Sequence, residues 1–396
     1  MNHSTWNLTI PTLDASQNRS LGDAISEVTS NLTYRDRINI ISILAYSTLV
    51  TGEGSPPFSD LELYAVTRVY DPTVAKRLEA KIGRRNPPVT VSVGQLDILQ
   101  FTHWKSIQAY DIKAGGKVIY GNPDILDRVT LSAKEIPKYE SIKILLNLAV
   151  AKLNGALSSE ILKNAELEPG EKSRFAYNCA KAHISICRAL LNFVGSYETS
   201  LALRDETFRK SYGTLFPSLH EDVPELARDI SNATSMVLSS QYVEDNLLDY
   251  WFRAQRNVKA VLKFLLQEYF AANSDEMETI LLLERFPHSL LDSLIYLLRV
   301  SARKLEFSSS LRSLLVEPWI KVHMASSFVL LAVQSDRTVD DRFVEYGYRK
   351  LAEVYPLEAM ESESLSAWEQ VRRTCVKLIE ESLFPPPHMP GDIAAQ

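Results

Sequence analysis

The sequence has few cysteines and no long apolar run. Its three cysteines, Cys179, Cys187 and Cys375, are an odd number without Cys-x-x-Cys spacing, which argues against a disulfide framework and a structural zinc site. Residues 1–20 contain polar residues throughout and lack the apolar core of a signal peptide. The most apolar stretches are too short or too interrupted to cross ~30 Å of hydrocarbon. We therefore expect a cytoplasmic protein with no membrane partner.

The sequence also lacks an excess of positive charge. Its 43 Lys and Arg residues stand against 49 Asp and Glu residues, for a formal charge of −6. Such a chain has no overall tendency to condense on a phosphate backbone, so a nucleic-acid partner would need a local basic cleft. With 396 residues, 45% of them hydrophobic and 23% charged, the composition indicates a soluble globular protein with two or three cores.

The hydrophobic pattern changes near residues 124–138. Before this point, short β-branched runs predict strands at 38–46, 61–69 and 89–93, and helical periodicity predicts helices at 72–82 and 103–114. After it, apolar residues recur every three or four positions and strand signals nearly vanish. The predicted fold class is α+β, with a small mixed-sheet domain followed by a large all-α region.

These patterns divide the chain into five parts. We expect a flexible N-terminus at 1–21, an α/β domain at 22–130 and a helical domain at 131–240. A C-terminal helical region at 241–384 and a flexible tail at 385–396 follow, although no linker composition marks the division near 240. The paired apolar helical faces of residues 290–298 would suit a homodimer.

The segment most informative about chemistry is residues 41–66, ISILAYSTLVTGEGSPPFSDLELYAV. A strand ends near Ser47 and Thr48, and a second strand begins near Asp60. Because side chains alternate along a strand, Asp60 and Glu62 should project from one face, about 7 Å apart. Such a pair suits Mg²⁺ or Mn²⁺, which share their ligand shell with nucleotide phosphates, although a solvated strand face would give the same pattern.

This segment resembles the DNA polymerase beta-type nucleotidyltransferase superfamily, in which a Gly-Ser turn precedes an acidic pair spaced by one residue. The resemblance implies a nucleotide-binding turn at Ser47 and Thr48 and metal ligands at Asp60 and Glu62. It also implies transfer of a nucleoside monophosphate from a nucleoside triphosphate, most naturally ATP, to a hydroxyl of a small molecule, a protein or an RNA end.

Two positions depart from the family pattern. Tyr46 stands where the family has glycine. The family's third carboxylate belongs on a neighbouring strand at Thr90 or Ser92, and neither residue is acidic. Asp97 is the nearest carboxylate and could serve as this catalytic group if the strand ends differently from the 89–93 pattern. The alternative hypothesis is a catalytically degraded member of the fold that acts as a binding or scaffold protein.

Downstream segments extend the resemblance over about half of the chain. Residues 110–126, YDIKAGGKVIYGNPDIL, look like the segment that closes the nucleotidyltransferase domain. The helix that contains Lys181 resembles the helical domain of antibiotic-modifying members, so Lys181 is a candidate nucleotide ligand. An ordinary surface lysine is the simpler explanation of its position.

The same helix carries Cys179, His183 and Cys187 at intervals of four residues. A straight helix cannot arrange these three side chains around one ion, because the outer Cα atoms are ~12 Å apart. We therefore expect them to pack in a core, with His183 satisfied by a hydrogen bond.

Overall fold

The computed structural model describes residues 8–54, 56–71, 73–242, 244, 246–286 and 318–380. The chain divides into two compact units. The first comprises Met1–Pro137, Gly195–Arg204 and Val237–Gln241, and the second Lys138–Val194, Asp205–Met236 and Tyr242–Gln396. The first unit contains a mixed four-stranded sheet and the second is helical, so the α+β prediction is confirmed. The expected dimer face at 290–298 and the tail at 385–396 lie outside the described residues.

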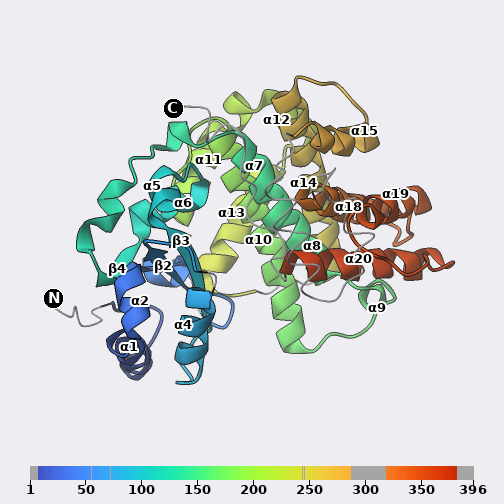
Figure 1. Ribbon diagram of the computed structural model, residues 1–396. Coiled ribbons are helices and arrows are strands. Elements are labelled where there is room, and N and C mark those ends of the chain that lie inside the picture. Colours follow the sequence, from blue (N-terminus) through green and yellow to red (C-terminus); the bar gives the residue numbers. More distant parts are fainter. Residues whose placement is uncertain are drawn as a thin grey trace. The chain divides into compact units, whose positions relative to one another are not determined.

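The sheet of the first unit has the strand order β3-β2-β1-β4 (Figure 1). Its central strands, β1 (Ile40–Tyr46) and β2 (Leu61–Thr67), are antiparallel. β3 (Val91–Asp97) pairs with β2 in parallel, and β4 (Lys117–Gly121) pairs with β1 in antiparallel orientation. The parallel step is possible because a helix crosses between β2 and β3.

Side chains alternate between the two faces of this sheet, and the two faces differ in how deeply they are buried. In β2, Leu61, Leu63 and Ala65 are buried, whereas Glu62 and Tyr64 are half-buried. The buried set packs in one hydrophobic core with side chains of α1 (Ala15–Ser30) and α4 (Thr73–Gly83). Glu62 and Tyr64 therefore project from the face opposite α1 and α4.

The other short elements of the first unit precede, connect or follow the strands. They are α2 (Tyr34–Asn39), α3 (Thr48–Thr51), α5 (Ile98–His103), α6 (Ile107–Gly115) and the 3₁₀ helices η1 (Pro123–Arg128) and η2 (Ala133–Glu135).

The N-terminal segment is more ordered than expected. Asp14 caps α1, since its side chain accepts hydrogen bonds from the backbone N–H groups of Ser16 and Gln17, both at 2.8 Å. Leu21 and Ile25 are buried in the core. The prediction of a flexible segment at 1–21 is therefore wrong for residues 8–21, because a capping box and a buried apolar stripe fix the helix.

The strand predictions are confirmed for β1 and β2, whereas β3 begins two residues later than expected and continues to Asp97. β4 was not predicted, because it occupies a short segment between glycines. Gly121 ends it at φ +90°, where a Cβ atom would lie 2.0 Å from the carbonyl oxygen of Ile41. Only glycine tolerates this close backbone approach.

The second unit is built from helices. A nearly continuous helical run comprises α7 (Tyr139–Ile144), the π-helical turn η3 (Leu145–Val150) and α8 (Ala151–Ala156). The others are α9 (Ser159–Leu162), α10 (Pro169–Phe193), α11 (Leu201–Leu215), α12 (Pro217–Asp222), α13 (Leu226–Ser239), α14 (Leu247–Phe270), α15 (Glu276–Leu281), η4 (Leu282–Arg285), α18 (Pro318–Ala332), α19 (Asp341–Ala352) and α20 (Ser364–Glu380). α11 begins with residues of the first unit, and α13 ends in residues of the first unit.

One hydrophobic core joins these helices across the division expected near residue 240. Trp251 is fully buried and donates its indole N–H to the carbonyl of Leu153 at 2.9 Å. Trp368 does the same to the carbonyl of Val329 at 3.0 Å. Residues 142–286 and 319–378 contribute to this core. The cut at 240 therefore does not separate two helical domains.

The three cysteines are free thiols buried in the second unit. As expected, Cys179 and Cys187 pack in the core, and His183 is satisfied by hydrogen bonds. Among the helices that the structure describes, none is both long and apolar enough to cross a bilayer.

Candidate functional site

The acidic pair lies at the start of β2. Asp60 immediately precedes the strand and is exposed, and Glu62 is its second residue and half-buried. The intervening Leu61 is fully buried, and its N–H donates to the carbonyl of Thr90 at 2.9 Å. This alternation agrees with the prediction that both carboxylates project from one face of the strand.

The Ser47-Thr48 turn lies at the same end of the sheet. Tyr46 is the last residue of β1 and pairs directly with Glu62 across the antiparallel strands. Ser47 is the N-cap of α3, and its hydroxyl accepts a hydrogen bond from the N–H of Val50 at 3.4 Å. The Thr48 hydroxyl donates to that of Ser59, the residue before Asp60, at 3.2 Å. The turn and the acidic pair are therefore neighbours, as the sequence predicted.

The glycine-containing loop between them packs tightly. A Cβ atom on Gly54 would lie 2.4 Å from the Thr48 hydroxyl oxygen and 2.5 Å from that of Ser59. Any side chain at this position would have to displace the two hydroxyls that hold the turn to the start of β2.

Glu62 is held by a hydrogen-bonded chain on its own face of the sheet. Tyr64 donates its phenolic proton to Oε2 of Glu62 at 2.8 Å, and the side-chain amide of Gln108 on α6 donates to the phenolic oxygen of Tyr64. Burial raises the pKa of Tyr64 well above its ordinary value, and the neighbouring Glu62 carboxylate raises it further. Tyr64 therefore remains a protonated donor at neutral pH.

Gly94 on β3 makes room for the Tyr64 ring. The two residues are paired across the parallel strands. A Cβ atom on Gly94 would lie 2.8 Å and 2.9 Å from two ring carbons of Tyr64. Because Gly94 has no side chain, the Tyr64 ring can occupy the position from which its hydroxyl donates to Glu62.

The register of β2 and β3 separates Asp97 from the acidic pair. Glu62 pairs with Ser92, one of the two positions expected for the third carboxylate. Asp97 pairs with Thr67, five positions beyond Glu62, which corresponds to ~16 Å along the strand. The structure therefore does not bring Asp97 together with Asp60 and Glu62. Among the described residues, no three His, Cys, Asp or Glu side chains are grouped closely enough to hold a metal ion.

Tyr46 packs beside the C-terminal end of α6. A Cβ atom on Gly115 would lie 3.2 Å from the Thr51 methyl group and 3.6 Å from the Tyr46 ring. The aromatic side chain of Tyr46 therefore lies close to α6 and α3 within the same unit.

Glu53 was not recognised as a site residue from the sequence. Its Oε1 atom accepts hydrogen bonds from the Ser200 hydroxyl at 2.7 Å and from the N–H of Leu201, the first residue of α11, at 2.8 Å. A carboxylate at a helix N-terminus satisfies a free N–H group and interacts favourably with the helix dipole. The loop between the turn and the acidic pair is thus fixed to residues 200–201.

A second buried network lies on α6, three residues beyond Gln108. The Tyr197 hydroxyl lies 2.8 Å and 3.0 Å from the two carboxylate oxygens of Asp111, and Arg204 donates to the Tyr197 oxygen at 3.1 Å. All three side chains are buried. α6 therefore connects the site face of the sheet, through Gln108, with segment Gly195–Arg204, through Asp111.

Lys181 belongs to α10 in the second unit. Its ammonium group lies over the Tyr177 ring, 5.3 Å from the centroid. The Ser185 hydroxyl, one turn further along α10, donates to the carbonyl of Lys181 at 2.7 Å. These contacts are those of a partly buried lysine packed against an aromatic ring.

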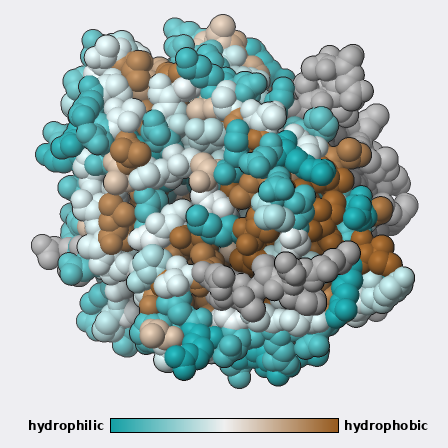
Figure 2. Space-filling model, turned by 90° about the vertical axis from the view of Figure 1, so that its left-hand side faces the viewer, coloured by the Kyte–Doolittle hydropathy of each residue, from teal (hydrophilic) through white to brown (hydrophobic). Residues whose placement is uncertain are grey.

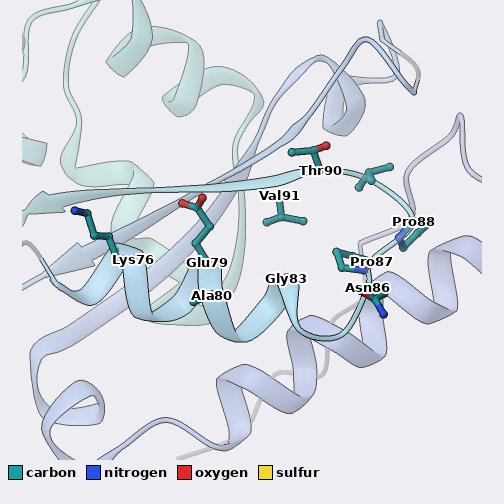
Figure 3. A pocket seen from close by; sticks show the side chains of 10 residues that line it. Lys76, Glu79, Ala80, Gly83, Asn86, Pro87, Pro88, Thr90 and Val91 are labelled. Atoms are coloured by element: carbon teal, nitrogen blue, oxygen red, sulfur yellow. The ribbon is translucent and has the colours of Figure 1, made fainter. Parts of the chain in front are cut away.

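A cavity of about 810 Å³ lies beside the edge strand β3, between α4 and residues 86–91. Figure 3 shows Val91 directed toward α4 and Thr90 directed away from it. Because Thr90 shares a face with Ser92, which pairs with Glu62, the cavity is on the face opposite the acidic pair. We therefore do not assign it to the candidate site.

The chain was compared with protein-family models, with curated proteins and with solved structures, and none of them matches it.

Proposed function

We propose that the chain is a metal-dependent nucleotidyltransferase that transfers a nucleoside monophosphate from a triphosphate, most naturally ATP, to a hydroxyl acceptor. The observation that carries this proposal is the pairing of Tyr46 with Glu62. It sets the hydroxyl-bearing turn, Ser47 and Thr48, beside the same-face acids Asp60 and Glu62. A turn with hydroxyls and N–H groups beside two carboxylates suits a triphosphate bound with a divalent cation.

The donor set fits Mg²⁺ or Mn²⁺ in part. Mg²⁺ is commonly bound by one or two carboxylates together with substrate phosphates, and Asp60 and Glu62 would provide the carboxylates. When bound, such an ion neutralises charge on the phosphates during an in-line displacement.

The surrounding residues orient the site in this proposal. Tyr64 fixes one carboxylate oxygen of Glu62, Oε2, by a hydrogen bond. Ser47 and Thr48 fix the backbone of the turn that would contact phosphate oxygens. Ser92, opposite Glu62, can accept or donate a hydrogen bond, but its hydroxyl is not a general base at neutral pH.

The test is nucleotide-dependent pyrophosphate release with Mg²⁺ or Mn²⁺. We expect Asp60→Asn and Glu62→Gln each to reduce the rate at least about 100-fold, because removing electrostatic groups from such a site commonly costs this much. The matched control is Asp124→Asn, which removes an exposed carboxylate from η1 of the same unit. Equal release by wild type and both site variants would contradict the proposal.

The position of Ser92 favours a second candidate, a catalytically degraded binding or scaffold protein with the same site. Without an acid opposite Glu62, the acceptor hydroxyl lacks a general base, a contribution worth ~10² to 10⁴ in rate. Calorimetry with a nonhydrolysable ATP analogue and Mg²⁺ discriminates the two. If the analogue binds in a Glu62-dependent way but no pyrophosphate is released, the protein is the degraded form. If the analogue does not bind in a metal-dependent way, the protein is a scaffold.

A further inference from the structure

Large hydrophobic side chains are exposed close to one another at one end of the first unit. Figure 2 shows that hydrophobic residues reach the surface in several groups among hydrophilic ones. By residue, Tyr34 is 82% exposed, Ile38 53%, Val69 69% and Tyr70 49%. The first two lie on α2 and the other two directly follow β2. Four large exposed side chains thus lie in two short segments.

Backbone and side-chain hydrogen bonds hold these two segments together. The N–H of Arg68 donates to the carbonyl of Asn39 at 2.8 Å. The Asn39 side chain accepts from the N–H of Val69 and donates to its carbonyl, both at 3.0 Å. The exposed groups are therefore fixed relative to one another, which lowers the entropy cost of binding a partner.

Three arginines lie among these hydrophobic residues. Arg35 and Arg37 are on α2, and Arg68 begins the segment after β2; all three are exposed. Arg35 pairs with Asp71 at 3.0 Å, Arg37 donates to the carbonyl of Ser30 at 2.6 Å, and Arg68 donates to the carbonyl of Ile38 at 3.1 Å. These bonds orient the guanidinium groups, each of which has five N–H donors.

The acids next to this surface are already paired. Asp36 is buried and forms an ion pair with Arg77 at 2.6 Å, and Asp71 pairs with Arg35. With Arg77 included, four arginines stand beside these two acids, so the surface carries a net positive charge on a chain whose formal charge is −6. We name it the Tyr-Arg surface and define it by Tyr34, Arg35, Arg37, Ile38, Arg68, Val69 and Tyr70.

We propose that the Tyr-Arg surface binds a partner protein through a segment that combines carboxylates with apolar side chains. Tyrosine and arginine are enriched at protein interfaces and dominate their binding energy. The guanidinium groups suit carboxylates, which they can bind in bidentate geometry. The aliphatic side chains of Ile38 and Val69 favour a polypeptide over a nucleic acid, because they offer neither a stacking face nor a phosphate-binding group.

The experiment selects peptides against the full chain with a phage-displayed library of random 12-residue peptides. Wild type is compared with Arg35→Glu/Arg68→Glu and with Tyr34→Ala/Tyr70→Ala. The controls are Leu99→Ala, which truncates a side chain 71% exposed on α5, and Arg84→Glu, which reverses an exposed charge after α4. Circular dichroism of every variant establishes that the fold is retained.

We expect the peptides enriched on wild type to be rich in Asp, Glu and apolar residues. Their affinity, measured by fluorescence anisotropy, should fall at least tenfold in either surface variant and less than twofold in either control. No enrichment on wild type, enrichment of basic peptides, or equal losses in the controls would each overturn the proposal. A fluorescent 12-nucleotide single-stranded RNA is measured in parallel; RNA binding lost in the surface variants, without acidic-peptide binding, would also overturn it.

Discussion

Tyr64 donates its phenolic proton to Glu62, two residues earlier on the same strand, at 2.8 Å. Both side chains project from the same face of β2, since residues two apart on a strand share a face. Gln108 donates to the same phenol from α6. The carboxylate of the candidate site is therefore oriented by a residue of its own strand and a helix 44 positions downstream.

Removing this hydroxyl should weaken the first unit without disturbing its packing. We expect Tyr64→Phe to lower the free energy of unfolding by about 1–3 kcal/mol, because a hydrogen bond to a charged group is lost. Chemical denaturation measures the difference. Tyr34→Phe, at an exposed position, should change stability by less than about 0.5 kcal/mol. Equal effects of the two substitutions would show that the Tyr64–Glu62 bond contributes nothing to stability.

Filling the space at Gly94 should displace the Tyr64 ring. We expect Gly94→Ala to lower the free energy of unfolding by about 1–3 kcal/mol, because the added Cβ atom would overlap the ring. Gly83→Ala is the matched control, since no heavy atom lies within 4 Å of its would-be Cβ atom and it lies in α4. Alanine there should be neutral or stabilising. A Gly94→Ala protein as stable as Gly83→Ala would contradict the overlap.

Glu53 should stabilise segment Gly195–Arg204. We expect Glu53→Ala to lower the free energy of unfolding by about 1–2 kcal/mol, because the N–H of Leu201 and the Ser200 hydroxyl lose their acceptor. Amide hydrogen exchange at residues 200–204 should also become faster. Glu166→Ala, at an exposed position before α10, is the control. Unchanged exchange in Glu53→Ala would argue against this role.

Two buried histidines should make the second unit sensitive to acid. Burial lowers the pKa of His183 to about 4 and that of His323 to about 3. His183 is neutral in a network in which Nδ1 lies 3.1 Å from the Cys179 carbonyl and Nε2 lies 3.1 Å from the Asn257 amide nitrogen. The unfolded chain binds protons near pH 6.5, before the folded chain does.

Acid therefore favours the unfolded chain, which binds these protons more readily than the folded chain. The stability contributed by each neutral histidine is fully present above about pH 6.5 and is lost as the pH falls toward the lowered pKa. For His183 the loss reaches roughly 3 kcal/mol by pH 4. Thermal unfolding between pH 7.5 and pH 4 measures it. His183→Gln should flatten this dependence and His103→Gln, at an exposed position, should not; an unchanged slope in His183→Gln would refute the assignment.

Local patterns were enough to predict part of the first unit. The β-branched runs of β1 and β2 and the periodicity of α4 are properties of neighbouring residues, and the structure confirms them. β4 could not be recognised, because Lys117–Gly121 becomes a strand only by pairing with β1, some 75 positions earlier. The Asp14 capping box and the Leu21–Ile25–Val28 stripe of α1 were available signals that the sequence reading missed.

Local patterns also predicted only part of the candidate site. Alternation along one strand predicts that Asp60 and Glu62 share a face. The position of Asp97 depends on how β3 pairs with β2, and this register is set by long-range packing. The contacts of Tyr64 with Gln108 and of Glu53 with Ser200 join distant segments, so no local pattern could indicate them.

The discontinuous sequence of the first unit limits how it can be produced alone. A fragment that ended at Pro137 would omit Tyr197, Ser200 and Leu201, which supply hydrogen bonds to the buried Asp111 and to Glu53. Asp111 and Glu53 would then lose these hydrogen bonds, which would lower the stability of the fragment. Dissection at Pro137 would therefore remove part of the first unit, although this is the boundary that the change of hydrophobic pattern suggests.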